Sequence, residues 1–492
     1  MQQLLLGIDV GTSHVKAALV TLQGQVVAQA QTQYSTQYPR AGWAEQNPED
    51  WWAGVVQATR AVLAESPGSV AGIGVSGQGC AVTLINAQGA VIRPAIIWLD
   101  TRSEPQCERL RQCCSEKILR RNGKSPAPYN ADPVLMWLQE HEPDSITAAR
   151  CSLTTTGYIN FRLTGAPVEN LSDASILFAF DLAQGCWSEE LIESFGLPAR
   201  LYPSLAPCNR VIGTLGKTPA TELGLAPGIP VVAGGEDTSS AGLASGAVQP
   251  GQVFLSLGTA GTLYATVAEP LVHAQLLTFL HVLPKQWLIG GSMSSVGSAL
   301  AWCRQLLAER MDFDELTALA AQSEPGANRL LFLPYLSGEL QPINDGYARG
   351  VFFGLSLNTG LPEFVRAVME GSAFAIAHNL SIVEALGSLI QELRAVGGPT
   401  RSPLWCQIIA DVTGRPLSVL ANDVGAPLGN ALLAAAGTGL IDDPAEIAAR
   451  SAQVARVFEP DESKHQYYQK LFAIYQELYP QLKAQFAKLN RV

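Results

Sequence analysis

Apolar residues along this chain fall into short runs that end at glycines and polar residues. The first run, LLLGI at residues 4–8, leads into DVGTS, and the segment KAALVTLQGQVVAQAQTQY follows it. Runs of this length that are broken by a Gln-Gly pair predict a strand, a turn and a second strand. We therefore expect a β-hairpin directly after the glycine turn.

The same layout occurs a second time near the middle of the chain. Residues 251–270, GQVFLSLGTAGTLYATVAEP, predict an apolar strand, a glycine turn with hydroxyl side chains and another apolar strand. The turn glycines, Gly11 and Gly258, are 258 − 11 = 247 residues apart, which is close to half of 492. This spacing indicates an internal duplication. We expect two domains, at residues 1–245 and 246–492.

The rest of the chain alternates short apolar strands with longer amphipathic stretches. Strands are predicted at residues 70–76, 91–100, 328–336 and 393–398, and amphipathic helices at residues 48–65 and 361–386. Strands that alternate with helices predict the α/β fold class.

Composition and charge exclude several kinds of partner. Hydrophobic residues make up 47% and charged residues 15%, which is typical of a folded protein. The net charge of −11 disfavours nucleic acid and anionic membranes. Nine dispersed cysteines without a CxxC pair favour a reducing compartment over a zinc site. With no basic leader and no run of 18 apolar residues, we expect a cytoplasmic location.

The two glycine turns are candidate phosphate sites. In GIDVGTSH, at residues 7–14, Asp9 ends a strand and Gly11 permits a tight turn, after which hydroxyls and backbone N–H groups follow. SLGTAGT, at residues 256–262, supplies a similar turn in the second half. Such turns can hold phosphate oxygens with donors fixed in advance. One turn alone is equally compatible with an ordinary hairpin, but two turns indicate a phosphate chain held between the domains.

Two adjacent acids form the candidate catalytic centre, in GGEDT at residues 234–238. A strand is predicted before them at residues 229–233 and a helix of small residues after them at residues 238–247. In α/β folds such strand-to-helix corners carry functional sites. Successive side chains at a strand end diverge, so one acid can face a cleft. We expect this to be Asp237, held by backbone donors at the helix start; the alternative is a plain N-cap.

Other motifs have simple structural interpretations. GWAEQNPEDWW, at residues 42–52, predicts a capped helix with core tryptophans. The pair of Asp100 and Arg102 is more often structural than catalytic. The stretch at residues 395–416 turns through two glycines into a helix that begins at Ser402 and Pro403. Without acids, this turn suits a nucleobase, although an ordinary loop would fit the spacing equally well.

A family resemblance covers nearly the whole chain. ARGVFFGLSLNTGLPEFVRAVMEG, at residues 348–371, resembles the long signature of the FGGY carbohydrate kinases, and GIDVGTS, GWAEQNPEDWW, LSLGTAG and LPYLSGE occur around it in family order. In general appearance the chain is xylulokinase-like. The resemblance implies two RNase-H-like domains of the actin and hexokinase type that close an interdomain cleft over ATP and a sugar.

The resemblance also implies roles for individual residues. The family motif GGGD aligns its catalytic base with Asp237, so that Glu236 replaces a glycine, and Asp9 is expected to help hold Mg²⁺. The residues implied for phosphate contact are Thr12, Ser13, His14, Lys16, Gly258 and Thr259. Those implied for the nucleoside wall are Gly297, Gly397, Gly398 and Ser402. Those implied for the sugar are Gln78, Gly79, Cys80, Trp98, Tyr129 and Thr238.

Several positions depart from the family pattern. Gly79 and Cys80 stand where glycerol kinases have Arg-Glu and xylulokinases usually have Met-His. Val134 replaces a lysine, Gly157 an aspartate, and WLD at residues 98–100 a WND. A small pair at 79 and 80 leaves room for a bulkier or differently bonded sugar.

We expect an ATP-dependent kinase for a small free sugar, first a ketopentose and alternatively a polyol such as erythritol or xylitol. A non-catalytic sugar or nucleotide sensor is the competing interpretation from another class, and intact Asp9 and Asp237 speak against it. An actin-like or chaperone ATPase would need no sugar loop. A homodimer is possible.

Overall fold

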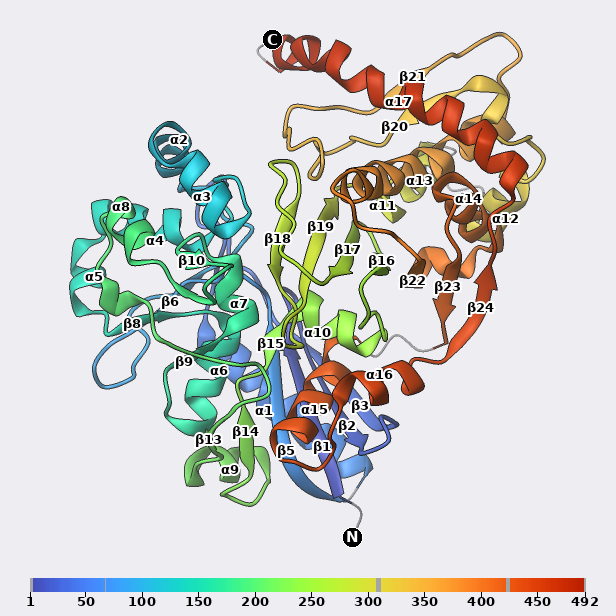
Figure 1. The fold of residues 1–492 in the computed structure, drawn as a ribbon. Helices are drawn as coiled ribbons and strands as arrows, with labels where there is room; N and C mark the ends of the chain where they lie inside the picture. Colours follow the sequence, from blue (N-terminus) through green and yellow to red (C-terminus); the bar gives the residue numbers. More distant parts are fainter. Residues whose placement is uncertain (1–2, 67, 307–310, 422–424, 491–492) are drawn as a thin grey trace.

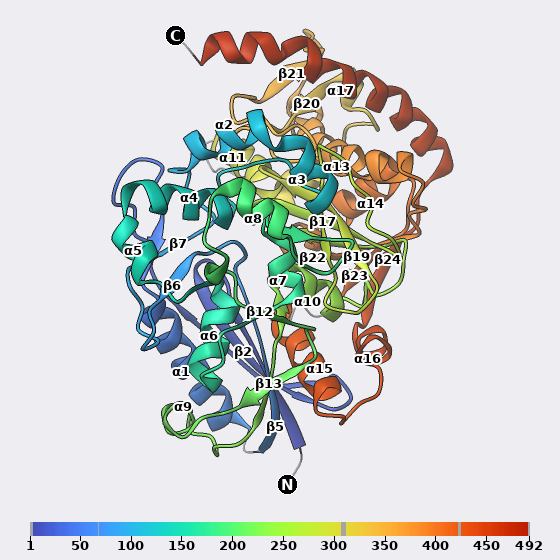
Figure 2. The same ribbon diagram turned by 60° about the vertical axis from the view of Figure 1, so that its left-hand side comes forward.

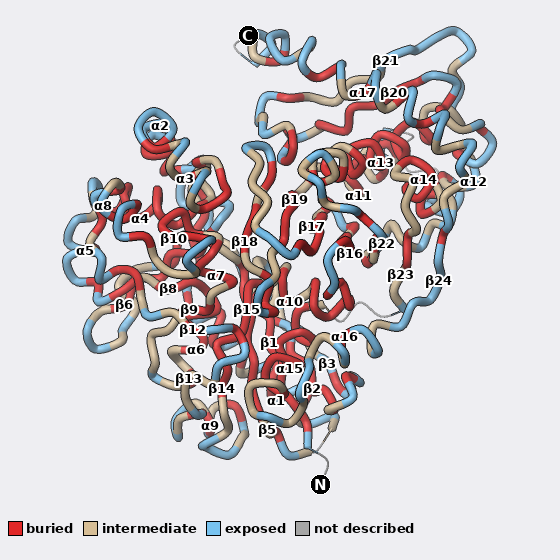
Figure 3. Tube along the Cα trace, in the orientation of Figure 1, coloured by how far each residue is buried: buried red, intermediate tan, exposed pale blue. Residues whose placement is uncertain are grey.

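Two bodies of sheet and helix make up the molecule (Figure 1). The computed structural model describes residues 3–66, 68–306, 311–421 and 425–490. Each body is built around a seven-stranded sheet. Figure 3 shows buried residues concentrated in the strands of both sheets and in the helices between and beside them. No helix in the described part of the chain is both long and apolar enough to cross a bilayer.

The first sheet contains parallel and antiparallel strands. Its order is β13-β14-β5-β1-β2-β3, and β15 also pairs with β5. The bounds are β1 Gln3–Val10, β2 His14–Thr21, β3 Val26–Gln33, β5 Ser69–Gly77, β13 Val211–Thr214, β14 Pro230–Val232 and β15 Gly235–Glu236.

The second sheet has the order β18-β19-β17-β16-β22-β23-β24. The bounds are β16 Gln252–Leu257, β17 Gly261–Val267, β18 Leu277–Leu280, β19 Trp287–Met293, β22 Glu392–Val396, β23 Leu417–Leu420 and β24 Val454–Phe458.

The first strand of each sheet, β1 or β16, has the same kinds of neighbour. β1 pairs antiparallel with β2 and parallel with β5, and β16 pairs antiparallel with β17 and parallel with β22. The hairpin predicted after the first glycine turn is present as β2 and β3, which pair antiparallel. Gly11 and Gly258 lie in the turns that join the first two strands of each sheet. The α/β class and the repeated layout follow the sequence prediction.

Helices from both halves of the chain cover the first sheet. α1 (Pro48–Glu65) packs on one side, and its N-cap Asn47 accepts a hydrogen bond from the Glu49 N–H, as the motif predicts. α15 (Ala426–Gly437) packs on β1 and β5 although it lies near the end of the chain. Gly7 permits this approach, because a Cβ there would lie 1.7 Å from the Pro427 carbonyl oxygen.

α10 (Asp237–Ala244) packs beside α15 between the two bodies (Figure 1). The two helices approach closely at Gly429, where a Cβ would lie 2.1 Å from the carbonyl oxygen of Ser240. The chain passes between the bodies three times: from α10 to β16, from β23 to α15, and from α16 (Pro444–Ser451) to β24.

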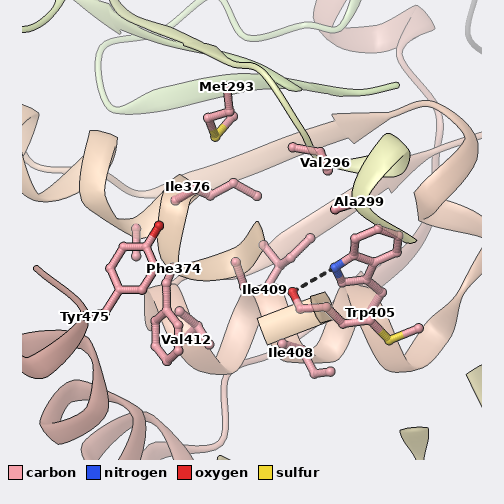
Figure 4. Close-up of a cluster of buried hydrophobic side chains, with 14 of the residues drawn as sticks. Met293, Val296, Ala299, Phe374, Ile376, Trp405, Ile408, Ile409, Val412 and Tyr475 are labelled. Carbon is pink, nitrogen blue, oxygen red and sulfur yellow. Dashed lines mark hydrogen bonds between the residues drawn. The ribbon is translucent and has the colours of Figure 1, made fainter. Parts of the chain in front are cut away.

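The largest hydrophobic cluster belongs to the second body (Figure 4). α13 (Leu361–Ala385) and α14 (Pro403–Thr413) pack together there, and Trp405 donates its indole N–H to the Met369 carbonyl oxygen over 3.1 Å. Apolar burial of this kind is the main favourable term in folding. It holds the turns before α14 on a rigid base.

The two bodies also meet at β18, which lies beside α7 (Leu171–Ile176); Figure 2 turns this side forward. The Lys124 amine is fully buried and donates to the Thr278 carbonyl oxygen over 2.6 Å. Ser172 donates to the Leu280 carbonyl oxygen over 3.1 Å. This contact holds one edge of the second sheet against the first body.

Two strand predictions were too long. Residues 328–336 form only β20 (Leu331–Leu333), and the second case is at residues 91–100. Residues 91–100 form only the short β7 (Ala95–Ile96), because Pro94 lacks an N–H and the chain turns after Ile97, where the Asp100 N–H donates to the Ile97 carbonyl oxygen. The turn leaves Trp98 outside the core, where it can contribute to a site.

Candidate active site

The first glycine turn lies between β1 and β2. Asp9 stands one residue before the end of β1, opposite Lys16 of β2. The Ser76 hydroxyl donates to Asp9 Oδ1 over 2.8 Å, and Asn430 Nδ2 donates to the Ser76 hydroxyl oxygen over 2.8 Å. The Gly11 N–H closes the turn on the His14 carbonyl oxygen over 3.0 Å. Asp9 is thus held from a neighbouring strand and, through Ser76, from α15.

The electrostatics of Asp9 reveal a second acid nearby. Burial, followed by the negative charge of Asp237, raises the pKa of Asp9 to about 6, although the Ser76 hydrogen bond and Lys16 oppose the shift. Two carboxylates that influence each other in this way form a site for a cation or for a shared proton. The structure therefore brings Asp9 and Asp237, 228 residues apart (237 − 9), to one place.

The two acids at the start of α10, Glu236 and Asp237, differ in burial and in hydrogen-bond partners. Glu236 is 5% exposed and is the N-cap, accepting a hydrogen bond from the Ser239 N–H over 2.7 Å. Asp237 is half-buried and accepts a hydrogen bond from the Thr238 hydroxyl over 3.0 Å. The expectation that backbone donors hold Asp237 is wrong, because Glu236 takes that position. The plain N-cap interpretation of Asp237 fails for the same reason.

The second glycine turn meets the predicted nucleoside residues. Gly258 and Thr259 are exposed at the turn. The Gly297 N–H donates to the Gly258 carbonyl oxygen over 2.9 Å. Gly397 has φ 106°, and a Cβ there would lie 2.0 Å from the Leu257 carbonyl oxygen, so a glycine is needed. These residues form one surface beside the second turn.

The same surface extends to the start of α14. Gly398 is exposed, and the Ser402 hydroxyl caps α14 by accepting a hydrogen bond from the Trp405 N–H over 3.2 Å. Pro403 is the first residue of the helix, as the sequence predicts.

Gln46 connects the first turn to the predicted sugar loop, and the sequence interpretation missed it. Its Nε2 donates to the Thr12 carbonyl oxygen over 2.8 Å. Its Oε1 accepts from Gln78 Nε2 over 2.7 Å and from the Trp51 indole over 2.8 Å. The signal was present in GWAEQNPEDWW, but that motif predicts only a helix cap. Gln46 orients groups that belong to both ligand regions.

The predicted sugar residues lie around this connection. Gln78 is 1% exposed, and its Oε1 has no hydrogen-bond partner among the described residues. Trp98 is 41% exposed, and its indole N–H donates to the Thr12 hydroxyl oxygen over 2.9 Å. Tyr129 is half-buried, and burial raises the pKa of its hydroxyl.

Gly79 and Cys80, which have small side chains, belong to the same set of predicted sugar residues. Cys80 is buried and has φ 58°, an uncommon backbone conformation for a residue with a side chain. A Cβ at Gly79 would lie 3.3 Å from Ile176 Cδ1. The space beside Gly79 is therefore limited by α7, so a larger residue there would displace Ile176.

The other departures from the family pattern are structural. Val134 is buried in a hydrophobic cluster. Gly157 lies against Glu169, whose Oε1 would be 2.1 Å from a Cβ at that position. Arg102 binds Asp100 over 2.7 Å in a buried ion pair, which supports the structural interpretation of that pair.

Of the residues predicted for the site, only Lys16 lines either of the two cavities described next. A cavity of about 750 Å³ between the bodies is lined by α10 residues and by Phe254 and Val396, but not by Asp237 or either turn. A smaller cavity of about 370 Å³ is lined by Lys16, Gln31 and Pro427, on the strand that follows the first turn. The predicted residues therefore define the candidate site better than cavity size does.

Family models match both halves of the chain. The model for the N-terminal domain of the FGGY family of carbohydrate kinases matches residues 4–244, and that for the C-terminal domain matches residues 253–438. The chain belongs to the FGGY family of carbohydrate kinases.

Individual relatives agree with this assignment. The xylulose kinase of Escherichia coli (strain K12) is 36% identical over 438 residues, which are 87% of this chain and 89% of the relative. The xylulose kinase structure from Rhodospirillum rubrum has a TM-score of 0.93 at 33% identity, covering 98% of this chain and 100% of its own. The gluconate kinase structure from Lactobacillus acidophilus has a TM-score of 0.94 at 26% identity, covering 99% and 100%.

The comparisons confirm the two-domain fold class and the ATP-dependent carbohydrate kinase activity that the sequence predicts. In this FGGY kinase, a nucleotide and a sugar are therefore the small molecules that the candidate site has to accommodate.

Proposed function

We propose that this FGGY kinase transfers the terminal phosphoryl group of ATP to a hydroxyl of a ketopentose, with Asp237 as the catalytic base. The observation that carries the proposal is the position of Asp237: it is the half-buried acid of its pair and lies close enough to Asp9 to raise the pKa of that carboxyl. The relatives named xylulose kinase support the ketopentose.

Asp237 accepts the proton that the sugar hydroxyl loses as its oxygen attacks phosphorus. Phosphoryl transfer has a loose transition state, so little covalent work is required and positioning dominates. The Thr238 hydroxyl holds one Asp237 oxygen, which restricts the orientation of the carboxylate. Gly258 and Thr259 hold phosphate oxygens from the second domain, while Thr12, Ser13, His14 and Lys16 approach them from the first.

Asp9 suits a role at a magnesium ion. It is a buried carboxylate with an acid neighbour and one hydroxyl donor. Among the described residues no group of three or more potential ligands is gathered for a metal, and Mg²⁺ commonly uses one or two carboxylates together with phosphates and water. When bound, Mg²⁺ would neutralise charge on the phosphates.

The remaining predicted residues bind the two substrates. Gln78, Gly79, Cys80, Trp98, Tyr129 and Thr238 contact the sugar, and Gly297, Gly397, Gly398 and Ser402 form the nucleoside wall. The partnerless Gln78 oxygen can accept a hydrogen bond from a sugar hydroxyl. Gly79 and Cys80 in place of a larger pair keep a polyol as the second candidate substrate. A homodimer and a cytoplasmic location stay predictions.

The test is ATP turnover with a panel of pentuloses, hexuloses, polyols and gluconate. We expect a ketopentose to give the highest kcat/KM. Asp237→Asn should lower kcat by a factor of about 10² to 10⁴, because the general base is lost while the shape is kept. Asp144→Asn, on the exposed first turn of α5 (Pro143–Ala148), is the control with full activity. Sugar-dependent turnover that survives in D237N would refute the base assignment, and ATP-independent binding of sugar without turnover would favour the sensor.

A further inference from the structure

Gln78 follows β5 at a point where three neighbouring strands end together. The last residues of β1, β5 and β15 pair side by side in parallel, so the next residues on the three strands are Gly11, Gln78 and Asp237. The Gln78 N–H donates to the Val10 carbonyl oxygen over 2.8 Å, which continues the pairing with β1. Gln78 therefore lies between the first glycine turn and the proposed base.

The hydrogen bonds of Gln46 determine which end of its side-chain amide faces which partner. The Trp51 indole N–H can only donate, and it lies 2.8 Å from Gln46 Oε1. The Thr12 carbonyl oxygen can only accept, and it lies 2.8 Å from Gln46 Nε2. Nε2 also donates to the Thr36 hydroxyl oxygen over 2.7 Å. Reversing the Gln46 amide would place donor against donor and acceptor against acceptor.

The orientation of Gln46 in turn determines that of Gln78. Gln78 Nε2 donates to Gln46 Oε1 over 2.7 Å, and a reversed Gln78 amide would place two oxygens against each other. Gln78 Oε1 is the atom that is left over, and it is buried without a hydrogen-bond partner among the residues that the structure covers. Because an unpaired buried acceptor is costly, a ligand that supplies a donor is favoured over one that does not.

We propose that Gln46 is a positioning residue that holds the Gln78 amide with its oxygen available, so that the acceptor sugar has to present a hydroxyl to that oxygen. The inference rests on the proposed sugar contact of Gln78. Trp51 is a fully buried residue of α1, and Thr12 belongs to the first turn, so Gln46 cannot rotate without breaking bonds to both. The sugar site therefore selects a hydroxyl at this position and rejects an analogue that carries hydrogen there.

Four variants separate this role from a purely structural one. Gln46→Met and Gln78→Met each remove an amide with little change in size, and the double variant Q46M/Q78M tests whether the two residues act through one another. Gln46→Glu is the conservative variant, because its carboxylate still accepts from Gln78 Nε2 and loses only the donor to Thr12.

Gln139→Met is the matched control in the same body. Gln139 of α4 (Ala131–His141) donates to the Gly196 carbonyl oxygen over 3.0 Å, a bond that includes no residue predicted for the site. The probes are the sugar of the panel with the highest kcat/KM, which we expect to be xylulose, and its monodeoxy analogues. The measurements are kcat and sugar KM at saturating ATP, together with Tm.

In the wild type, we expect one reactive monodeoxy analogue to lose about 10- to 100-fold in kcat/KM, because it leaves the Gln78 oxygen unpaired. Q78M should raise the KM of the parent sugar by a similar factor, with kcat changed by less than about threefold, and should accept that analogue as well as the parent. Q46M should lose the same discrimination although Gln78 is unchanged, and Q46M/Q78M should stay within about threefold of Q78M. Q46E and Q139M should discriminate as the wild type does.

Full discrimination in Q46M would overturn the proposal, because a purely structural residue affects the parent sugar and its analogues equally. Additive losses in the double variant would do the same. Where Q46M fails to fold, Q46E and Q78M decide: loss of discrimination in Q46E, or its survival in Q78M, contradicts the proposed roles. If the wild type turns over a sugar while these variants behave like it, only the positioning role fails. If no sugar of the panel is turned over, the proposed function fails and this inference with it.

Discussion

At the scale of single residues, the site depends on polar groups whose partners the sequence does not reveal. The two glycine turns could be located from the sequence, because each follows an apolar run, whereas the roles of Asp9 and Asp237 stay predictions. Gln46 could not be located, because its four hydrogen bonds join segments that are brought together only by the fold. The sequence also could not show that Glu236, and not Asp237, accepts the backbone N–H at the start of α10. Which of two adjacent acids is buried depends on the tertiary structure.

Glu169 gives a residue-scale prediction about pH and stability. Burial, with Asp173 as the second cause, raises the pKa of Glu169 to about 8 from the ordinary value of 4.5. Between these values the native protein holds a proton that the unfolded chain has released. The free energy of unfolding contributed by Glu169 is therefore full below about pH 4.5 and falls as the pH rises through about 8.

Glu169→Gln should remove this loss, because a neutral amide has no proton to release and can still accept the Thr154 N–H. We expect the stability of E169Q relative to wild type to increase by about 2 kcal/mol between pH 6 and pH 9. Thermal or urea unfolding across this pH range measures the difference. A difference that stays constant with pH would contradict the raised pKa.

At the scale of elements, glycines set the distance between helices and strands. A Cβ at Gly429 of α15 would lie 2.1 Å from the Ser240 carbonyl oxygen of α10, a backbone atom that cannot move away easily. Gly242 lies in α10 itself, but its nearest contact would be 3.9 Å away, at His281 Nε2. The two positions are both helical glycines and differ mainly in free space.

Gly429→Ala should therefore destabilise the protein by about 2 kcal/mol or more, because the two helices have to separate. Gly242→Ala is the matched control and should be neutral or stabilising by up to about 1 kcal/mol, since alanine favours helix. Urea unfolding of the two variants compares them. Equal stability would show that the close contact between α10 and α15 is not a packing constraint.

The sequence predicts most of the helices and strands, but it does not predict that α15 packs on the first sheet. Periodicity identified the strands of both hairpins and the helix at residues 48–65, since local apolar spacing decides them. The packing of α15 on β1 cannot be read from periodicity, because it joins residues that are about 420 positions apart: Asn430 Nδ2 donates to the Ile8 carbonyl oxygen over 2.8 Å. Likewise, Pro94 shortened a predicted strand through its missing N–H.

At the scale of the whole molecule, the position of α15 predicts how the halves depend on each other. Residues 1–245 alone would leave the faces of β1 and β5 that α15 covers in contact with water. We expect this fragment to be poorly folded, with broad amide resonances, and to gain structure when residues 246–492 are supplied as a second chain. A well-folded isolated fragment would contradict a structural need for α15. The boundary at 245 stays a prediction.

The bond between Trp98 and Thr12 has a practical consequence for the whole kinase. Trp98 is the exposed tryptophan among the described residues, and its indole N–H is held by the hydroxyl of the first turn. We expect its fluorescence emission to change when ATP is added, because the proposed phosphate contact of Thr12 would alter this hydrogen bond. If Thr12 binds phosphate as proposed, Trp98 is an intrinsic optical reporter of nucleotide occupancy, readable at equilibrium and in the absence of any acceptor sugar.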